Sequence, residues 1–125
     1  MNIEKHIEYW QKGADEENEV AELLLKKKKT RHALFFAHLG LEKILKSSVV
    51  KRTREMPPRI HNLLRLAELA QLELSDEQII FLRQFDIFQL EGRYPDSFGM
   101  RISLESAEGK IQEARRIFQW IKNQL

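Results

Sequence analysis

The sequence of 125 residues contains no cysteine and only three prolines, and no long apolar run interrupts it. Without cysteine, disulfide bonds and thiolate metal sites are excluded. A membrane-spanning helix needs about 18 or more consecutive apolar residues, which this chain lacks. Its first residues show neither the apolar core nor the cleavage pattern of a signal peptide. We therefore expect a cytoplasmic protein with no membrane partner.

An excess of charge of one sign is missing too. The 21 Lys and Arg residues face 19 Asp and Glu residues, so that the net charge is +2 with neutral histidines. This balance does not indicate nucleic-acid binding. Two short segments, 26–32 and 51–54, are basic. Such runs near helix ends are typical either of a solvated turn that complements the helix dipole or of a patch that contacts phosphate.

Strand patterns are absent, because no segment alternates apolar and polar residues with β-branched enrichment. Apolar residues recur instead at helical spacing, over residues 2–27, 30–51, 60–72, 75–90 and 103–125. The length suits a single domain that spans residues 1–125. The pattern predicts an all-α fold, an up-and-down antiparallel helical bundle of four main helices plus one short helix.

Segment 30–51 is predicted to be the central helix. Its apolar stripe includes the small residues Ala33, Ala37 and Gly40, which let a neighbouring helix approach closely. Thr30 is expected to cap its start. Further along the chain, "SDEQ", residues 75–78, has the pattern of a capping box and predicts the start of another helix.

The number of apolar side chains is large for one small bundle. Several of them are adjacent on a helix, so that one stripe facing a single core cannot bury them all. The residues concerned are Phe35, Phe36, Ile80, Phe81, Phe85, Ile87 and Phe88. An exposed patch made of the remaining side chains is usually covered by a second subunit. We therefore expect a homodimer.

The stretch "LEGRYPDS", residues 90–97, interrupts the helical pattern. A glycine at position 92 suits a helix end, and Pro95 ends the helix and holds Tyr94 extended. Neither role requires the side chains of Arg93 and Tyr94. These side chains, with Asp96, are expected either to dock the loop on the bundle or to contact a ligand or partner.

The docking alternative needs an acidic partner for Arg93. The central helix turns Glu42 partly inward, and a buried carboxylate requires a partner. Glu42 is therefore the first candidate, with Asp96 and Glu91 as the others, because an arginine can make two parallel hydrogen bonds to one carboxylate.

Four segments, in chain order, resemble the HEPN domain family. They are "YWQKGADEENEVAELLL" at 9–25, "HALFFAHLGLEKILKSSV" at 32–49 with Glu42 and Lys43 as the family's Glu-Lys pair, "IHNLLRLAELA" at 60–70, and "GRYPD" at 92–96, which resembles the Arg-Tyr-Pro-Asp element of one subgroup. The resemblance covers nearly the whole chain. It implies a small prokaryotic protein that forms a homodimer. It also implies a minimal nucleotidyltransferase encoded nearby as the partner in a toxin–antitoxin-type module, and a nucleotide-binding role.

Many HEPN proteins are metal-independent ribonucleases that use an arginine, four to six residues, and then a histidine. In that chemistry histidine transfers a proton and arginine stabilises the phosphate charge. No histidine follows Arg93 at this spacing; only Arg54 and His61 match it, and two prolines separate them. The pair is retained as a candidate, although a structural role at the start of a helix suits His61 better, where its ring can bond the backbone.

Metal-ligating spacing is absent among the histidines and acids, so neither a metal nor another cofactor is expected. Three functions remain open. The first is a non-catalytic HEPN binding protein that holds nucleotide or RNA phosphate near Arg93, Tyr94, Asp96, Glu42 and Lys43. The second is a ribonuclease toxin, and the third is a dimeric scaffold without a ligand.

Overall fold

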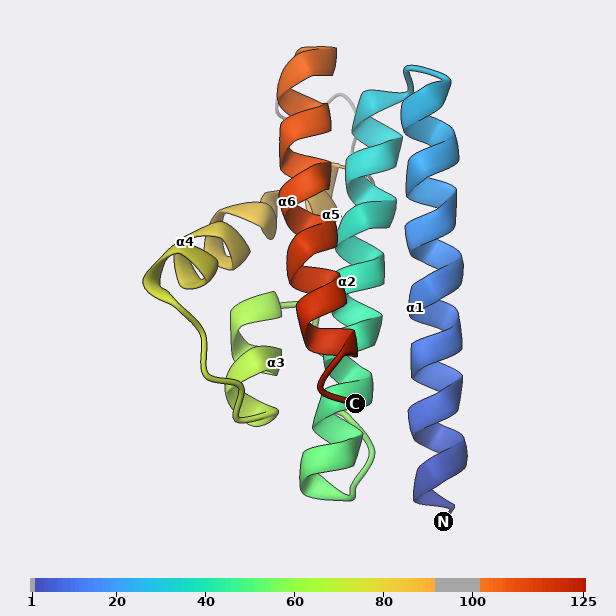
Figure 1. Cartoon of the computed structure of the whole chain (residues 1–125), viewed down its shortest axis with the longest axis vertical. Coiled ribbons are helices and arrows are strands. Elements are labelled where there is room, and N and C mark those ends of the chain that lie inside the picture. Colours follow the sequence, from blue (N-terminus) through green and yellow to red (C-terminus); the bar gives the residue numbers. More distant parts are fainter. Residues whose placement is uncertain (1, 92–101) are drawn as a thin grey trace.

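The computed structural model describes residues 2–91 and 102–125, and this part of the chain is helical without a strand (Figure 1). The helices are α1 (Ile3–Lys26), α2 (Thr30–Thr53), α3 (Leu63–Leu69), α4 (Asp76–Phe85), α5 (Ile87–Glu91) and α6 (Leu104–Lys122). The predicted all-α bundle is confirmed. Among the described residues, no helix is long and apolar enough to cross a membrane.

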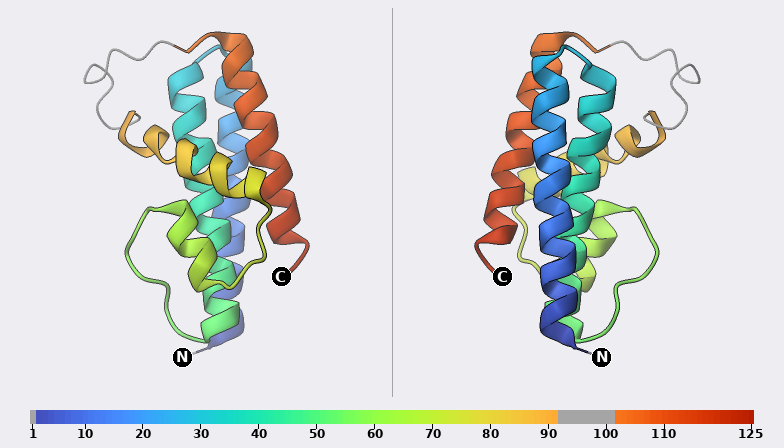
Figure 2. Two further views of the ribbon diagram at one scale, coloured as in Figure 1. Left: turned by 90° about the vertical axis from the view of Figure 1, so that its left-hand side faces the viewer. Right: turned by 90° about the vertical axis from the view of Figure 1, so that its right-hand side faces the viewer.

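The three long helices form the main body of the bundle. In Figure 1, α1 and α2 run antiparallel, and α6 returns beside them in the direction of α2. The shorter helices α3, α4 and α5 carry the chain back toward the other end, with α4 inclined to the long helices (Figure 2). The helix α2 contacts α1, α3, α5 and α6, so segment 30–51 is central as predicted.

The close approach of α1 and α2 depends on small side chains. A Cβ atom added at Gly40 would lie 3.4 Å from the backbone nitrogen of Asn18 and 3.5 Å from the backbone oxygen of Ala14. Ala14 on α1 and Ala33 on α2 are fully buried. The expectation that small residues on the central helix admit a neighbour is therefore confirmed, and that neighbour is α1.

Side chains cap several helix starts. Ser75 and Gln78 form the predicted capping box at α4, each side chain bonded to the backbone nitrogen of the other residue. Ser103 caps α6 in the same region where the last helix was predicted to begin. The expectation for Thr30 is wrong. Thr30 is the first residue of α2, the cap position is Lys29, and no side chain bonds the helix start there.

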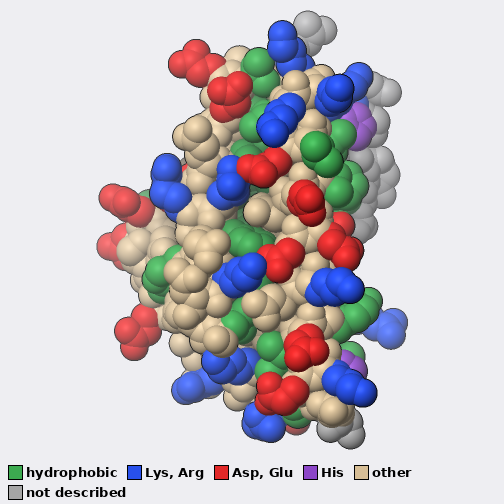
Figure 3. Space-filling model, turned by 45° about the vertical axis from the view of Figure 1, so that its right-hand side comes forward, with side chains coloured by type: hydrophobic (Ala, Val, Ile, Leu, Met, Phe, Trp, Pro, Cys, Tyr) green, Lys and Arg blue, Asp and Glu red, His purple; other side chains and the backbone are tan. Residues whose placement is uncertain are grey.

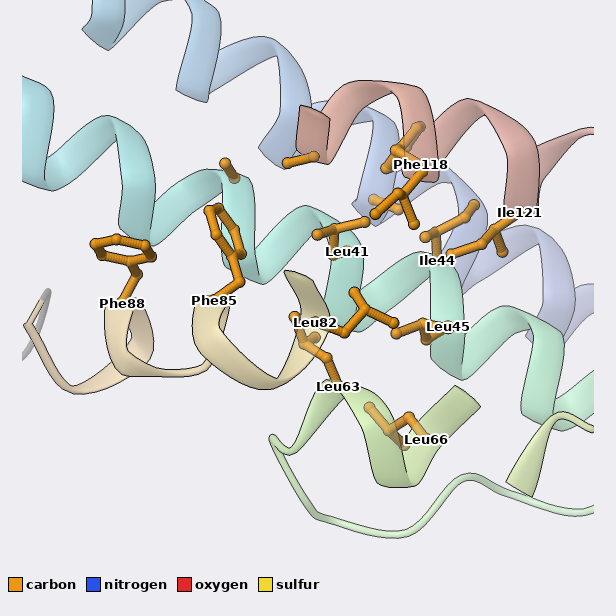
Figure 4. Packing of buried hydrophobic residues seen from close by; sticks show 14 of the residues in the cluster. Leu41, Ile44, Leu45, Leu63, Leu66, Leu82, Phe85, Phe88, Phe118 and Ile121 are labelled. Atoms are coloured by element: carbon orange, nitrogen blue, oxygen red, sulfur yellow. The ribbon is translucent and has the colours of Figure 1, made fainter. Parts of the chain in front are cut away.

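The predicted helix 75–90 is divided at Asp86, which separates α4 from α5. The side chains of Leu82, Phe85 and Phe88 are buried on one side of these two helices. In Figure 4, Leu82 points toward α2 between Leu41 and Leu63. The same core thus joins α2, α3 and α4, and it fixes where the polar side chains between these helices can lie.

Candidate functional site

The buried surface of α2 carries a row of three polar side chains. His38, Glu42 and Lys46 follow one another at intervals of four residues, so they lie on one side of the helix. Their exposed fractions are 1%, 5% and 6%. Buried polar groups are costly unless they are hydrogen-bonded, and buried charges unless they are paired. The partners of this row therefore define the polar interior of the molecule.

Glu42 is at the centre of the row. Its carboxylate accepts a hydrogen bond of 2.9 Å from Lys46 Nζ, and both of its oxygens lie 3.1 Å from His61 Nδ1. Because an ionised carboxylate only accepts, the pairing assigns the proton to Nδ1. The His61 side chain is 42% exposed, against 6% for Glu42. His61 thus connects a buried ion pair with the surface.

His38 makes a second polar contact one turn earlier. Its Nε2 lies 2.9 Å from Asp86 Oδ1, and the same oxygen accepts the backbone N–H of Leu63 at 3.1 Å. The His38 ring also stacks against Phe85, with 6.2 Å between ring centroids. One carboxylate at the α4–α5 boundary therefore joins α2 to the first turn of α3.

A pocket of about 300 Å³ opens on α1; we call it the α1 pocket. It is lined by Tyr9, Trp10, Lys12, Gly13, Glu16 and Lys43. Lys43 comes from α2 and reaches it past Gly13, where an added Cβ would lie 3.3 Å from Lys43 Cδ. Its ammonium lies 3.7 Å from Glu17. Figure 3 shows acidic and basic side chains interspersed over one face of the molecule.

Trp10 links the α1 pocket to the buried row. The ammonium of Lys46 lies 5.3 Å from the centroid of the Trp10 ring, within the range of a cation–π contact. Tyr9 contacts Trp10 edge to face, with 5.3 Å between centroids. Trp10 Nε1 is buried and bonds none of the residues that the structure describes. Such a donor costs about 1–3 kcal/mol, which the packing of the indole ring has to offset.

An apolar pocket lies between α4, α5 and α6, and we call it the α4–α5 pocket. Its volume is also about 300 Å³, and it is lined by Phe81, Gln84, Phe85, Ile87, Phe88, Ile102 and Lys110. Ile87, which lines it, is 37% exposed. Ile80, which lies one turn before the lining residue Gln84 on α4, is 51% exposed. Of the seven apolar residues that one core was not expected to bury together, these two are the most exposed, whereas Phe85 and Phe88 are buried.

The candidate residues from the sequence fall into three groups. Glu42 is buried, as expected, and its partners among the described residues are Lys46 and His61. Lys43 lines the α1 pocket. Arg93, Tyr94 and Asp96 lie outside the described residues, as does the expected contact between Arg93 and Glu42.

The two catalytic candidates have different surroundings. Arg54 is exposed and ends α2 in the left-handed conformation, with φ of 62°. His61 precedes α3 and bonds the Glu42 carboxylate, and not the backbone as the sequence suggested. Within residues 2–91 and 102–125, no group of three or more His, Asp or Glu side chains could hold a metal ion.

The basic segments also differ from each other. Lys26, Lys27, Lys28 and Lys29 are exposed at the turn between α1 and α2. At the other end of α2, Lys51 donates to the backbone oxygen of Gln124 and Arg52 to the side-chain oxygen of Gln71. Lys51 and Arg52 of segment 51–54 therefore bond α2 to two residues that come later in the chain.

Sequence reasoning missed Lys46, His38 and Asp86. The signal for His38 and Lys46 is only their spacing of four residues from Glu42, because α2 also carries other polar and charged residues. No such signal marks Asp86, because a single acid in a helical segment is usually solvated. Its role depends on the tertiary placement of α3 against α4.

The fold and the sequence together define the class of the protein. The HEPN domain family model matches residues 7–124, and the chain belongs to this family. Among solved structures, the chain is similar to the crystal structure of TT1696 from Thermus thermophilus, with a TM-score of 0.81, 22% identity and 100% of both chains covered. At this identity the likeness establishes the fold alone. A search of curated proteins gave no match.

Proposed function

We propose that the chain is a non-catalytic HEPN binding protein of the Arg-Tyr-Pro-Asp subgroup. It forms a homodimer, acts with a minimal nucleotidyltransferase in a toxin–antitoxin-type module, and binds nucleotide or RNA phosphate. The observation that carries the non-catalytic part is the pairing of its buried titratable groups. Glu42 pairs with Lys46 and His61, and Asp86 with His38 and a backbone N–H. The contacts of Glu42 with His61 and of Asp86 with His38 tie α2 to the chain before α3 and to the end of α4. His61, the histidine that catalysis would need, therefore has a structural use.

The test combines RNA cleavage with RNA binding. We expect the purified chain to bind single-stranded RNA without cleaving it, and His61→Ala to leave the RNA intact as well. Products are followed on a denaturing gel, and binding by fluorescence anisotropy of a labelled RNA. Cleavage by the wild type that His61→Ala abolishes would contradict the non-catalytic proposal. Failure of the wild type to bind RNA or nucleotide would contradict the binding part.

The partner is tested separately. Co-expression with the product of the neighbouring gene should yield a complex that survives size-exclusion chromatography, and that product should carry a nucleotidyltransferase sequence. A neighbour of another class, or separate elution of the two proteins, would remove this part of the proposal.

For the homodimer, the α4–α5 pocket is the surface that we assign to the second subunit. It combines ring edges and exposed aliphatic side chains, the composition typical of the buried centre of an interface. Among the described residues that line it, Lys110 is the one with a charged side chain.

Ile80→Lys is expected to dissociate this dimer. A lysine at the interface buries a charge without a partner, and the loss of about 2 kcal/mol typical of a central contact corresponds to roughly a thirtyfold weaker dimer. Light scattering at micromolar concentration should give about twice 14.9 kDa for the wild type and 14.9 kDa for the variant. Leu23→Lys is the matched control, because Leu23 is similarly exposed, at 58%, but lies on α1. A monomeric wild type, or dissociation by the control alone, would contradict the assignment.

A metal-independent ribonuclease is the second candidate, favoured by the contact of His61 with Glu42. A carboxylate that holds Nδ1–H leaves Nε2 as the nitrogen that can accept a proton from a 2′-hydroxyl. The partial exposure of His61 lets a substrate approach. The cleavage assay above decides between the two functions.

A further inference from the structure

We propose that the α1 pocket holds one unpaired nucleobase, stacked on Tyr9, together with its phosphate, which Lys12 and Lys43 bind. The inference rests on the nucleotide or RNA binding proposed above and names the site where it takes place. The ligand chemistry is a flat aromatic ring with an attached anion. A free nucleotide and a single-stranded RNA both supply it.

The first argument is the exposure of Tyr9. Its side chain is 68% exposed, the highest value among the large hydrophobic residues that the structure describes. A tyrosine in this position adds little to folding, because most of its ring remains in water. An exposed ring is, however, what stacking of an unpaired base requires, and stacking tolerates any base because each has a π face.

The second argument is that a series of contacts leading to buried residues restricts the position of Tyr9. Its ring contacts Trp10 edge to face, Trp10 lies against the ammonium of Lys46, and Lys46 is fixed by its buried bond to Glu42. A ring held in this way loses less conformational freedom on binding than a free surface side chain does. The buried row of α2 thus supports the pocket without touching the ligand.

The third argument is the charge and shape of the pocket. Lys12 and Lys43 supply two ammonium groups and Glu16 one carboxylate. The contact of Lys43 with Glu17, at 3.7 Å, is too long for a strong hydrogen bond, so its donors remain available to a phosphate. Glu16 can accept a hydrogen bond from a ribose hydroxyl or an exocyclic amine. The volume of about 300 Å³ lies at the small end of ligand pockets, which suits one nucleotide unit.

Gly13 keeps the pocket open. It lies in the middle of α1, where glycine weakens a helix relative to alanine, so helix formation does not explain it. A side chain at this position would press on Lys43, since an added Cβ would lie 3.3 Å from Lys43 Cδ and 3.5 Å from Lys43 Nζ, and both Gly13 and Lys43 line the pocket. The glycine is thus placed where a larger residue would fill the site.

The experiment measures binding of two probes to the full chain. 5′-AMP is titrated by calorimetry, and a labelled single-stranded oligoadenylate of about ten nucleotides by fluorescence anisotropy. In a Trp120→Phe background Trp10 is the single tryptophan, and its emission should change as either probe fills the α1 pocket. Tyr9→Ala removes the stacking ring, Tyr9→Phe keeps it, and Gly13→Leu fills the pocket.

We expect Tyr9→Ala and Gly13→Leu to weaken binding by roughly tenfold or more, and Tyr9→Phe to bind like the wild type. Gly109→Leu is the matched control, because an added Cβ there meets no atom within 4 Å. It places the same side chain in the interior of another helix, and its binding should be unchanged. Thermal melts of all variants verify that each is folded.

The outcomes distinguish a failure of the proposed site from a failure of the proposed function. Binding of 5′-AMP that the variants lose supports the site with a free nucleotide as its source, and binding of the oligoadenylate alone supports it with RNA as the source. Wild-type binding that Tyr9→Ala and Gly13→Leu leave unchanged would overturn the site but keep the proposed function. No binding of either probe to the wild type would overturn both.

Discussion

Glu42→Ala is expected to lower the free energy of unfolding by about 3–5 kcal/mol, the cost of leaving one charge of a buried pair without its partner. Lys46 would remain buried, with an exposed fraction of 6%, and would lose its acceptor at 2.9 Å. His61 contributes less to the cost, since its partly exposed ring can bond water. Urea denaturation of the wild type and the variant measures the difference.

The double variant Glu42→Leu with Lys46→Met is the control. Replacement of a buried ion pair by apolar residues of similar size is often neutral or stabilising, so the double variant should regain most of the stability lost in Glu42→Ala. If the two variants were equally unstable, the loss would come from the altered packing of α2 and not from the unpaired lysine. A loss below about 1 kcal/mol in Glu42→Ala would show that water reaches the pair, as at a surface.

The second large effect concerns the carboxylate between α4 and α5. Asp86→Ala removes the acceptor of two donors, His38 Nε2 and the backbone N–H of Leu63. Each buried donor left without a partner costs about 1–3 kcal/mol, so we expect a loss of about 3 kcal/mol in thermal or urea unfolding. Asp86→Asn keeps one acceptor oxygen and should lose about half as much.

The result for Asp86 can be distinguished from a general weakness of α4. Asp76→Ala changes an acid in the first turn of the same helix that is exposed, and it should cost well under about 1 kcal/mol. Equally small losses in the two variants would indicate that Asp86 stabilises the fold no more than an exposed acid does. In that case the contacts with α2 and α3 would contribute little.

The fold was predictable from the sequence because its determinants are local. Helical spacing predicts each helix from residues that are close together in the chain, and the capping box at Ser75 predicts where one of them begins. The small residues around Gly40 predict one close contact in the same way. The division of the segment 75–90 was not predictable, since Asp86 bonds His38 and the start of α3, which are distant in sequence.

The candidate site was predicted only in part. The inward turn of Glu42 follows from its place in the apolar pattern of α2, and Lys43 follows from the family resemblance. The partners of Glu42 were not foreseen: position 46 reads as an ordinary lysine, and nothing in the pattern brings His61 across from the chain before α3. The α1 pocket depends on the path of the Lys43 side chain from α2 past Gly13. The helical pattern of a single segment does not predict such a contact between two helices.

The polar row on α2 also sets the alignment of the helices along one another. A slide of α2 by one turn, or about 5.4 Å, would bring Lys46 beside His61 and Glu42 beside Asp86. Two hydrogen-bond donors and two carboxylates would then face each other, although the bond between Glu42 and Lys46 within α2 would persist. An apolar row would tolerate such a slide. We infer that His38, Glu42 and Lys46 select one register of the bundle, as single polar residues do in coiled coils. The double variant Glu42→Leu with Lys46→Met should then be stable but show broadened amide signals by NMR. A spectrum as sharp as that of the wild type would contradict this role.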